Sequence, residues 1–357
     1  MARTGSDAVT IIEVAELARV SKSTAARALA GYGSVSGKAR QAVQAAAEEL
    51  GYQANALARS MITGRTMTVG VVIPDISNPF FANAVRGIST AAREAGYDVL
   101  LSSTEGEPGL ERRAVSVLTG KQADGVIIAP VSTEDTDHLE ELEAKGVAVA
   151  LLDRPAPKVR AASYVAVDHA GASGLAVHHL LDLGHRDIGI VTEAAALLPE
   201  EIDPEVASTL RPANARLWGY AMALRSAGIR YDPALVASSS YARGSAGDAV
   251  RFLLESRPHV TALYCTDGEL SAGAFAALQD MGIDCPGQVS LVGFDDQDWA
   301  TLVRPRLTVV EQPSYQLGRT VFTELIASIV TPDQRRRNRI LGGRLVVRDS
   351  TARARLV

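Results

Sequence analysis

The sequence predicts an α/β protein in which a small all-α headpiece precedes a sensor of two lobes, each built on a parallel sheet. Residues 10–50 carry three short helical patterns with cap residues in front of them. After Thr66, short β-branched runs alternate with amphipathic helical patterns, which is typical of parallel sheets covered by helices. This alternation occurs in two successive series, so we expect two lobes of similar architecture.

The first predicted helix begins after Thr10, because Glu13 follows three residues later as in a capping box. A second cap, Ser21, opens a second helix after the short connection at Arg19. The apolar positions at helical spacing are Val14, Leu17 and Ala18 in the first helix and Ala25, Ala28 and Leu29 in the second. Two short helices joined by a tight turn are typical of a helix-turn-helix unit.

In a helix-turn-helix unit, the second helix presents its early side chains to base edges and phosphates. The side chains at those positions are Lys22, Ser23, Ala26 and Arg27. A third helix is predicted from Ser36, as its N-cap, to Leu50, with Gly51 as a left-handed C-terminal cap. Three such helices can enclose a small core.

The first series of predicted strands consists of buried runs, and the helices between them end at glycine. The runs are TVGVVIP, YDVLLSS, GVIIAP and VAVALLD, and the glycines are Gly96, Gly120 and Gly146. The second series has YVAVD, DIGIVT, LVASSS, ALYCT and SLVGFDD, separated by helices such as 170–183, 214–227 and 269–281. Both series predict parallel sheets.

Ligands of open parallel sheets bind beyond the carboxyl ends of the strands, so the loops after these runs are the candidate binding site. The residues found there are Asp75, Asn78, Phe80, Phe81, Asp153, Arg154, Arg216, Asp267 and Asp295. Rings stack on sugar faces, while carboxylates and guanidinium groups bind hydroxyl pairs or an anion. Asp75, Asn78 and Asp267 can equally be strand-end caps. Trp218 and Trp299 either stack on ligand or fill the core, and for Trp218 we expect the core.

The register of VSKSTAARAL, GYGSVS, EELGYQANALARS and TVGVVIPDISNPFF resembles the lac-repressor (LacI/GalR) family of bacterial transcription regulators over nearly the whole chain. The resemblance implies a sensor with the type I periplasmic sugar-binding fold, whose strands cross between lobes near residues 167, 310 and 343. The expected domains are a headpiece at 1–54, a hinge helix and linker at 55–66, and a sensor at 67–357. Within the sensor we expect an N-lobe at about 67–166 and 312–341 and a C-lobe at about 167–311 and 342–357.

The resemblance also implies a hinge helix from Asn55 to Met61 that enters the DNA minor groove and wedges a side chain between base pairs. Met61 stands where the family usually has leucine, and ordinary linker packing is the alternative. Arg19 replaces a frequent glycine and Ala26 a frequent serine. The expected DNA-binding residues are Thr10, Ser21, Lys22, Ser23, Thr24, Ala26, Arg27, Ser34, Asn55, Ala58, Arg59 and Met61.

For the sensor, the resemblance implies that Phe80 and Phe81 stack on an effector. The polar contacts that it implies are Asp153 or Arg154, Arg216, Thr266 and Asp295. Arg216 stands three residues before Gly219, which is the family's spacing, whereas at Thr266 the family more often has asparagine. Sugars are the favoured effectors, and a pentose, hexose, polyol, sugar phosphate or nucleobase is compatible with these residues.

Charge and composition support a protein that binds DNA at one end. Residues 1–65 contain eight Lys or Arg and five Asp or Glu, a net charge of +3. Because the whole chain has a net charge of −5, the remaining residues carry a net charge of −8. No apolar run is long enough to span a bilayer, no apolar targeting stretch begins the chain, and Cys265 and Cys285 have neither metal nor disulfide spacing. We expect a cytoplasmic, nucleoid-associated protein.

Enzymatic chemistry is not expected. The adjacent acids Asp295 and Asp296 point in opposite directions at a strand end, and His178 and His179 diverge around a helix. The sequence has no serine elbow, no phosphate-cradling glycine loop and no zinc-ligand spacing. We therefore expect no catalytic residue, no metal and no cofactor.

The sequence therefore predicts a transcription regulator, a repressor, that binds pseudo-palindromic operator DNA as a homodimer and responds to a small-molecule effector. The alternative is a solute-binding protein that carries sugar without regulatory DNA binding. Residues 193–214 form a longer connection than usual. They are expected to be either a lid over the cleft or a surface excursion.

Overall fold

A computed structural model describes residues 9–30, 34–52, 64–194, 210–331 and 336–355. The chain divides into two compact units, Met1–Thr68 and Val69–Val357. The expected hinge helix, Asn55 to Met61, lies outside the described residues, as do residues 195–209 of the connection expected to be a lid. None of the described helices is long and apolar enough to cross a membrane.

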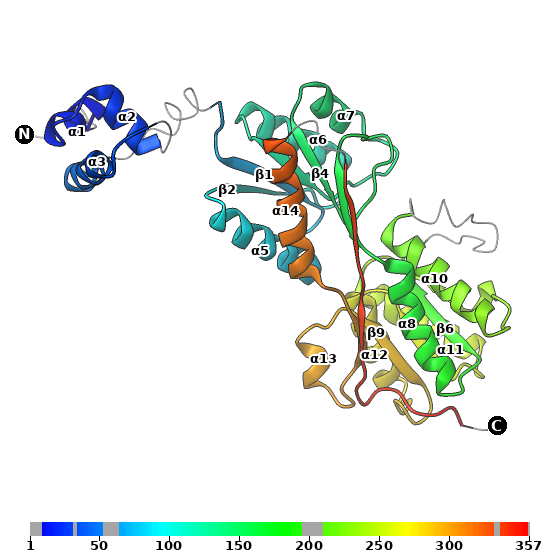
Figure 1. Cartoon of the computed structure of the whole chain (residues 1–357). Coiled ribbons are helices and arrows are strands. Elements are labelled where there is room, and N and C mark those ends of the chain that lie inside the picture. Colours follow the sequence, from blue (N-terminus) through cyan, green and yellow to red (C-terminus); the bar gives the residue numbers. More distant parts are fainter. Residues whose placement is uncertain (1–8, 31–33, 53–63, 195–209, 332–335, 356–357) are drawn as a thin grey trace, which may run out of the picture. The chain divides into compact units, whose positions relative to one another are not determined.

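The described part of the headpiece consists of α1 (Ile11–Leu17), α2 (Lys22–Ala30) and α3 (Gly37–Leu50) (Figure 1). The predicted caps are confirmed, since Thr10 and Glu13 form a capping box and Ser36 caps α3. Gly51 ends α3 with φ 65°, the left-handed conformation that glycine adopts at least cost. The core consists of Val14, Ala15, Ala25, Ala28, Val43, Ala46 and Ala47.

Two details of the headpiece bear on the predictions. Arg19 has φ 54°, so a non-glycine residue does occupy the left-handed region in the turn between α1 and α2. Leu17 was expected on the apolar face of α1, but it is 44% exposed. The buried face of this short helix is formed by Val14 and Ala15, and Leu17 points away from it.

The first sheet of the sensor has the strand order β11-β5-β4-β3-β1-β2, and its pairings β1–β3, β3–β4, β4–β5 and β5–β11 are parallel. Its strands are β1 (Thr68–Ile73), β2 (Asp98–Ser103), β3 (Gly125–Ile128), β4 (Ala148–Leu152), β5 (Ser163–Val167) and β11 (Asn338–Leu341). The helices of this lobe are α5 (Pro79–Glu94), α6 (Pro108–Gly120), α7 (Asp137–Ala144) and α14 (Ser314–Val330). We call this part of the sensor the N-lobe.

The second sheet has the order β12-β10-β9-β8-β6-β7, in which β12 is antiparallel to β10. Its strands are β6 (Ile188–Thr192), β7 (Val236–Ser238), β8 (Ala262–Cys265), β9 (Ser290–Phe294), β10 (Thr308–Glu311) and β12 (Arg344–Val346). The helices are α8 (His169–Asp182), α10 (Pro212–Ser226), the 3-10 turn η2 (Pro233–Leu235), α11 (Arg243–Ser256), α12 (Gly268–Asp280) and α13 (Trp299–Leu302). We call this part the C-lobe.

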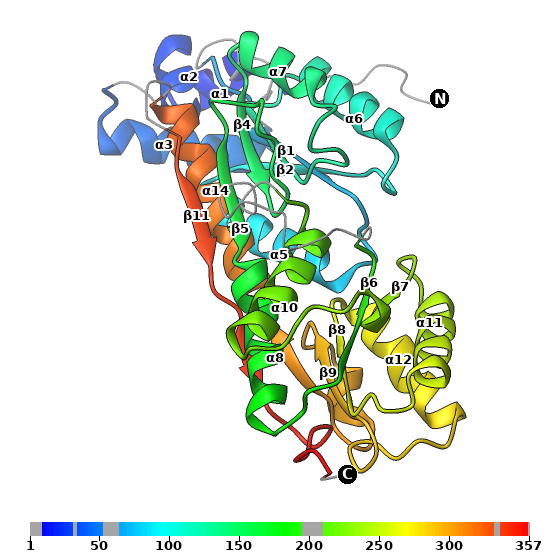
Figure 2. The same ribbon diagram turned by 90° about the vertical axis from the view of Figure 1, so that its right-hand side faces the viewer.

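The two lobes are connected by three crossings of the chain. The first leads from β5 into α8, the second from β10 into α14, and the third from β11 into β12 (Figures 1 and 2). Three crossings at one junction are typical of two lobes that hinge around a ligand.

The structure corrects two of the strand predictions. YVAVD was expected in the second series, but β5 pairs with β4 and β11 in the first sheet. YDVLLSS was expected to be buried, but β2 is mostly exposed, with Leu100 and Leu101 36% and 37% accessible. The reason is that β2 lies at the edge of its sheet and has a neighbour on one side only.

The glycine predicted at the end of α6 is confirmed. Gly120 is the last residue of the helix, and the left-handed residue that follows is Gln122, with φ 57°. Gly96 and Gly146 follow the ends of α5 and α7, as predicted, and both have positive φ. The remaining strands of both series and the helices predicted at 170–183, 214–227 and 269–281 are confirmed to within two residues at each end.

Candidate functional site

A cavity of about 560 Å³ opens between the lobes at the carboxyl ends of their strands. Its size is in the range of small-molecule sites. The sequence-predicted residues that line it are Asp75, Asn78, Phe80, Phe81, Asp153, Arg154, Arg216, Asp267 and Asp295. Thr266 does not line it, because its hydroxyl donates to the Val191 carbonyl at 3.2 Å and its side chain is buried. We call this cavity the cleft.

Arg216 is held at the cleft by a chain of buried polar contacts. The Nη2 group of Arg216 donates to Nδ1 of His169 at 3.2 Å, and Nε2 of His169 lies 3.0 Å from the Asp153 carboxylate. Because guanidinium can only donate, Nδ1 of His169 accepts and Nε2–H donates to Asp153. Burial lowers the pKa of His169, which keeps the ring neutral in this role. The three side chains therefore form one ordered relay.

Further contacts fix the plane of the Arg216 guanidinium. Its Nη1 donates to the Thr266 carbonyl at 2.7 Å, Nη2 also lies 3.3 Å from Oε1 of Gln312, and the group stacks 4.1 Å from the Phe294 ring centroid. Gln312 in turn donates to Asp295 at 2.6 Å. Thr266 thus contributes its backbone, not its side chain, to the site.

Close packing of α10 against α8 places Arg216 beside His169. A Cβ atom on Gly219 would overlap the backbone of Ala170, so only glycine permits this approach of the two helices. Arg216 lies one turn before Gly219 on α10. Packing therefore requires the glycine that stands three residues after Arg216 in the sequence.

Two acidic residues that directly follow strands have a strained backbone conformation. Asp153 after β4 has φ 64° and Asp295 after β9 has φ 65°, values that non-glycine residues rarely adopt. Burial and the neighbouring Asp295 raise the pKa of Asp267 to about 7, and burial also raises the pKa of Asp295. Burial would likewise raise the pKa of Asp153, but the contacts with His169 and Arg216 outweigh it and lower that pKa.

Asp75, Asn78 and Asp267, which were expected either to bind ligand or to cap a strand end, form caps and also line the cleft. Asp75 accepts from the Ser77 amide at 2.7 Å, Asn78 from the Phe80 amide at 2.9 Å, and Asp267 from the Glu269 amide at 2.7 Å. The amide group of Asn78 also donates to the Tyr241 hydroxyl at 2.7 Å. This bond joins the N-lobe to the C-lobe across the cleft.

The aromatic side of the cleft is formed by Phe80 and Phe81, which are buried and in edge-to-face contact at 5.1 Å. The guanidinium group of Arg154 lies over the Phe81 ring at 5.8 Å. Neither tryptophan lines the cleft. Trp299 packs against Phe275 in the C-lobe core, and half-buried Trp218 lines a different cavity.

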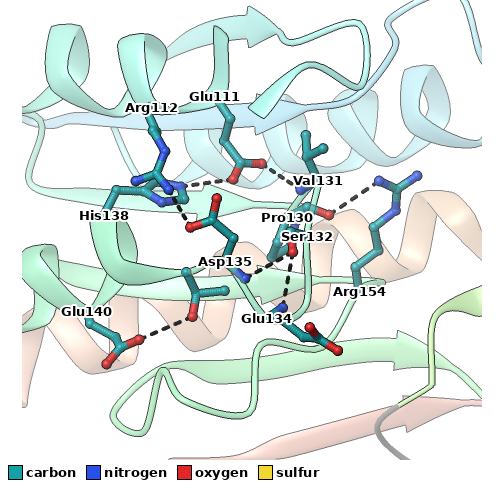
Figure 3. A network of polar contacts seen from close by, with 11 residues as sticks. Glu111, Arg112, Pro130, Val131, Ser132, Glu134, Asp135, His138, Glu140 and Arg154 are labelled. Carbon is teal, nitrogen blue, oxygen red and sulfur yellow. Dashed lines mark hydrogen bonds and ion pairs between the residues drawn. The ribbon is translucent and has the colours of Figure 1, made fainter. Parts of the chain in front are cut away.

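Arg154 is hydrogen-bonded to the loop that follows β3. Its Nη1 donates to the Pro130 carbonyl at 3.3 Å, and the next amide, that of Val131, donates to buried Glu111 at 2.7 Å. The second carboxylate oxygen of Glu111 lies 2.9 Å from Nε2 of His138 (Figure 3). Helices α6 and α7 thus hold the loop that positions Arg154.

Sequence reasoning missed several residues of the cleft. These are Ser103, Glu105, Glu193, Arg211, Tyr241 and Gln312, together with His169 behind them. Glu193 and Gln312 directly follow β6 and β10, so the rule that found Asp153 and Asp295 applies to them too. Tyr241 was missed although it lies three residues after β7. Gln312 was missed because β10 was expected only as a strand that crosses between the lobes near residue 310, and the residue after it was not considered.

The candidate DNA-binding surface is the start of α2. Ser21, Lys22, Ser23, Ala26 and Arg27 line one shallow hollow on the headpiece. Within it, Nε of Arg27 donates to the Ser23 carbonyl at 3.2 Å. The structure thus brings five of the predicted residues together on one exposed helix end.

The other predicted DNA-binding residues do not line this hollow or are not described. The hydroxyl of Thr24 lies 2.8 Å from that of Ser21, Thr10 caps α1, and Ser34 is exposed before α3. Asn55, Ala58, Arg59 and Met61 lie outside the described residues.

Two family models match the chain. Residues 66–344 match periplasmic binding proteins and the sugar binding domain of the LacI family, and residues 10–55 match bacterial regulatory proteins of the lacI family. Among curated relatives, catabolite control protein A of Priestia megaterium is 34% identical over 87% of this chain and 89% of the relative. The transcriptional repressor CytR of Escherichia coli K12 is 29% identical over 96% of both chains.

Solved structures agree with these matches. The transcriptional regulator CelR in complex with cellobiose is 29% identical, with a TM-score of 0.71, over 96% of this chain and 99% of that one. A LacI family regulator from Enterococcus faecium with bound ribose is 27% identical, with a TM-score of 0.68, over 81% of this chain and 100% of that one. The predicted fold class, a helix-turn-helix headpiece followed by a two-lobed sensor, is confirmed.

Proposed function

Because the chain belongs to the LacI family of bacterial regulatory proteins, we propose that it is a transcription repressor whose affinity for operator DNA is set by a small sugar in the cleft. The observation that carries the proposal is the buried relay from Asp153 through His169 to Arg216, which presents ordered polar groups beside two phenylalanine rings. Such a site binds hydroxyl pairs on one side and the apolar face of a ring on the other.

The charge of the cleft favours an uncharged sugar over a phosphorylated one. The acids Asp75, Glu105, Asp153, Glu193, Asp267 and Asp295 line it, against Arg154, Arg211 and Arg216. Even without Asp267 and Asp295, whose pKa values are raised, the acids outnumber the arginines. Excess carboxylate repels an anionic ligand and accepts hydrogen bonds from hydroxyl groups. Cellobiose and ribose, the sugars bound in the two related structures, are both uncharged.

We assign DNA binding to the α2 surface and to the segment after α3. In the proposal Ser21, Lys22, Ser23 and Arg27 enter the major groove, and the hinge at 55–66 folds on DNA with Met61 as the minor-groove wedge. A homodimer supplies two headpieces at 1–54 to a pseudo-palindromic operator, and the sensor at 67–357 supplies the dimer contacts. The site of action is the nucleoid in the cytoplasm.

No catalytic step belongs to the proposal. His169, a buried imidazole behind the cleft, is occupied at both nitrogens by Asp153 and Arg216. It therefore has no free lone pair with which to act on a ligand. The cleft is assigned to binding alone.

A mobility-shift assay on DNA from upstream of the protein's own gene tests the proposal. The protein is expected to shift this DNA, and sugars found by thermal-shift screening of the whole chain are expected to change the shift. A sugar carrier without regulatory function would bind the sugar and leave the DNA unshifted.

A further inference from the structure

Two acidic residues of the cleft follow neighbouring strands at the same distance from the paired residues. In the parallel pairing of β8 with β9, Tyr264 lies opposite Val292, and Asp267 and Asp295 each come three residues later. Both side chains line the cleft, where Asp267 is 9% exposed and Asp295 is half-buried. The two carboxyl groups are close enough for the charge of Asp295 to act on Asp267. We call these two residues the acid pair.

Hydrogen bonds from the protein hold both members of the acid pair in place. Asp267 accepts from the Glu269 amide at 2.7 Å as the cap of α12, and Asp295 accepts from Nε2 of Gln312 at 2.6 Å. The side-chain oxygen of Gln312 in turn accepts from Nη2 of Arg216 at 3.3 Å. At both acids the bond uses the oxygen Oδ1. A ligand that binds to Oδ2 therefore need not displace either bond.

Below about pH 7 the acid pair does not carry two negative charges. Removal from water disfavours each charge, and the charge of one carboxylate disfavours the charge of its neighbour. Burial and the charge of Asp295 raise the pKa of Asp267 to about 7, and burial raises the pKa of Asp295. Arg216 opposes both rises without cancelling them. The acid pair therefore holds one proton, mainly on Asp267, because the Gln312 amide and Arg216 stabilise the charge of Asp295.

Charged and titratable groups from several elements surround the acid pair. They are Asp153 after β4, His169 on α8, Glu193 after β6, Arg216 on α10, Tyr241 after β7, Cys265 on β8 and Glu269 on α12. Burial would raise the pKa of Asp153, but His169 and Arg216 lower it. Burial lowers the pKa of His169 and raises the pKa of Tyr241 and of the Cys265 thiol. None of these four titratable groups therefore changes its charge between pH 6.5 and 8.5.

A hydroxyl group is complementary to two carboxyl groups that hold one proton. The hydroxyl has one hydrogen to donate and an oxygen that accepts, while the acid pair offers one carboxylate oxygen that accepts and one O–H group that donates. Two ionised carboxylates offer acceptors only, and they favour an ammonium group instead. The protonation state of the acid pair therefore determines which class of ligand group binds beside it.

We propose that Asp267 and Asp295 share one proton and together bind one hydroxyl group of the sugar, Asp267 donating a hydrogen bond to it and Asp295 accepting one from it. This inference rests on the proposed function, because it takes the ligand to be an uncharged sugar. The sugar displaces water from the acid pair, which makes a second negative charge still less favourable. The complex therefore keeps the proton to a higher pH than the free protein, and the response to sugar weakens as the pH rises.

The shared proton can be measured without any sugar. Infrared difference spectra of the whole protein between pH 6.5 and pH 8.5 detect the C=O band of a protonated carboxyl group, and aspartate labelled with ¹³C at that group identifies the residue type. The band is expected at pH 6.5, is expected to disappear at pH 8.5, and should be lost in Asp267→Asn. Asparagine is also a good N-cap, so this variant keeps the start of α12. A wild-type protein without such a band would overturn the proposal.

Calorimetric titration with a panel of neutral sugars that includes ribose and cellobiose tests the link to binding. Affinity is expected to fall about tenfold from pH 6.5 to pH 8.5, because nearly all of the free protein has lost the proton at the higher pH. At pH 7.5, titrations in HEPES and in Tris should show uptake of about half a proton per sugar bound. An affinity that is constant or rises with pH contradicts the proposal. If none of the sugars binds, the proposed effector class is wrong, and the infrared band alone decides on the shared proton.

Two variants assign the pH dependence to the acid pair. Asp267→Asn is expected to bind the sugar equally well at pH 6.5 and pH 8.5, because the side-chain amide donates a hydrogen bond at either pH. Asp75→Asn is the matched control, because Asp75 lines the cleft but is hydrogen-bonded only to Ser77 among the described residues. It should keep the pH dependence of the wild type, whatever its effect on affinity. Equal pH dependence in the two variants would show that a group outside the acid pair is responsible.

Discussion

The side chain of Asn78 donates a hydrogen bond to the hydroxyl of Tyr241 at 2.7 Å, and the two residues belong to different lobes. Asn78 is fixed on its own side, because its carbonyl oxygen caps α5 at the Phe80 amide. The bond therefore measures how far apart the lobes stand. We expect a wider opening of the cleft to break it.

Removing the hydroxyl of Tyr241 should weaken sugar binding without changing the fold. Tyr241→Phe deletes the acceptor for Asn78, and a hydrogen bond of this kind contributes about 1 kcal/mol, so sugar affinity should fall about fivefold. Isothermal titration with a sugar identified by thermal-shift screening measures this change. Tyr231→Phe, in the same lobe but away from the cleft, is the control and should be silent.

Arg216→Lys should abolish the response to sugar and spare operator binding. A lysine cannot reproduce the planar contacts to Thr266, His169 and Gln312 together, so the relay to Asp153 is lost. A mobility-shift titration with and without sugar provides the readout. Arg225→Lys, exposed on the same helix, should behave as the wild type, and a normal sugar response in Arg216→Lys would refute the role of the relay.

The stability of the sensor should fall as the pH rises from about 4 to 7. The pKa of Asp267 is raised to about 7, so between the unfolded value near 4 and this value the folded state binds more protons than the unfolded state. The loss is at most about 4 kcal/mol, since each unit of pKa difference corresponds to about 1.4 kcal/mol. Denaturant unfolding at pH 5 and pH 7.5 measures it.

Asp267→Asn should flatten this pH dependence, because the amide does not titrate. Asp298→Asn is a control at an exposed acid of the same lobe, and it should leave the slope unchanged. A slope as steep in Asp267→Asn as in the wild type would show that another group is responsible.

Glu111→Ala should destabilise the N-lobe and loosen Arg154. The substitution leaves the Val131 amide and His138 without their buried partner, a loss of about 3 kcal/mol. Urea unfolding measures the stability, and sugar titration measures the effect on the cleft. Glu107→Ala, at the start of the same helix and without a side-chain cap bond, should change neither quantity.

Lys22→Ala should weaken operator binding and reduce its salt dependence. Lys22 is exposed at the first position of α2, inside the hollow that we assign to DNA, and loss of one phosphate contact lowers the salt slope by about 1. Fluorescence anisotropy at several salt concentrations provides the slope. Lys38→Ala, at the start of α3 and outside the hollow, should have a smaller effect.

The sequence predicted what local rules determine. The capping box at Thr10, the cap at Ser36 and the glycine turn at Gly51 depend on residues within a few positions, and all were confirmed. The polar residues that follow β4 and β9 were found because a strand end limits where a ligand can bind.

The sequence did not reveal relations between distant segments. Tyr241 meets Asn78 from 163 positions away, and Gln312 meets Arg216 from 96 positions away. Thr266 was assigned a side-chain role although its hydroxyl turns inward to Val191. The burial of β2 was also overestimated, because its place at the sheet edge depends on the order of distant strands and not on its own composition.

The third crossing has a consequence for biosynthesis. β11 completes the first sheet beside β5, yet residues 338–341 emerge from the ribosome after nearly all of the other lobe. Until these residues are synthesised, the sheet of the N-lobe lacks its last strand and the edge of β5 is unpaired. A protein truncated before residue 338 lacks the final strand of both lobes, β11 and β12. Because each lobe consists of separate segments of the chain, neither lobe can be produced as one uninterrupted fragment.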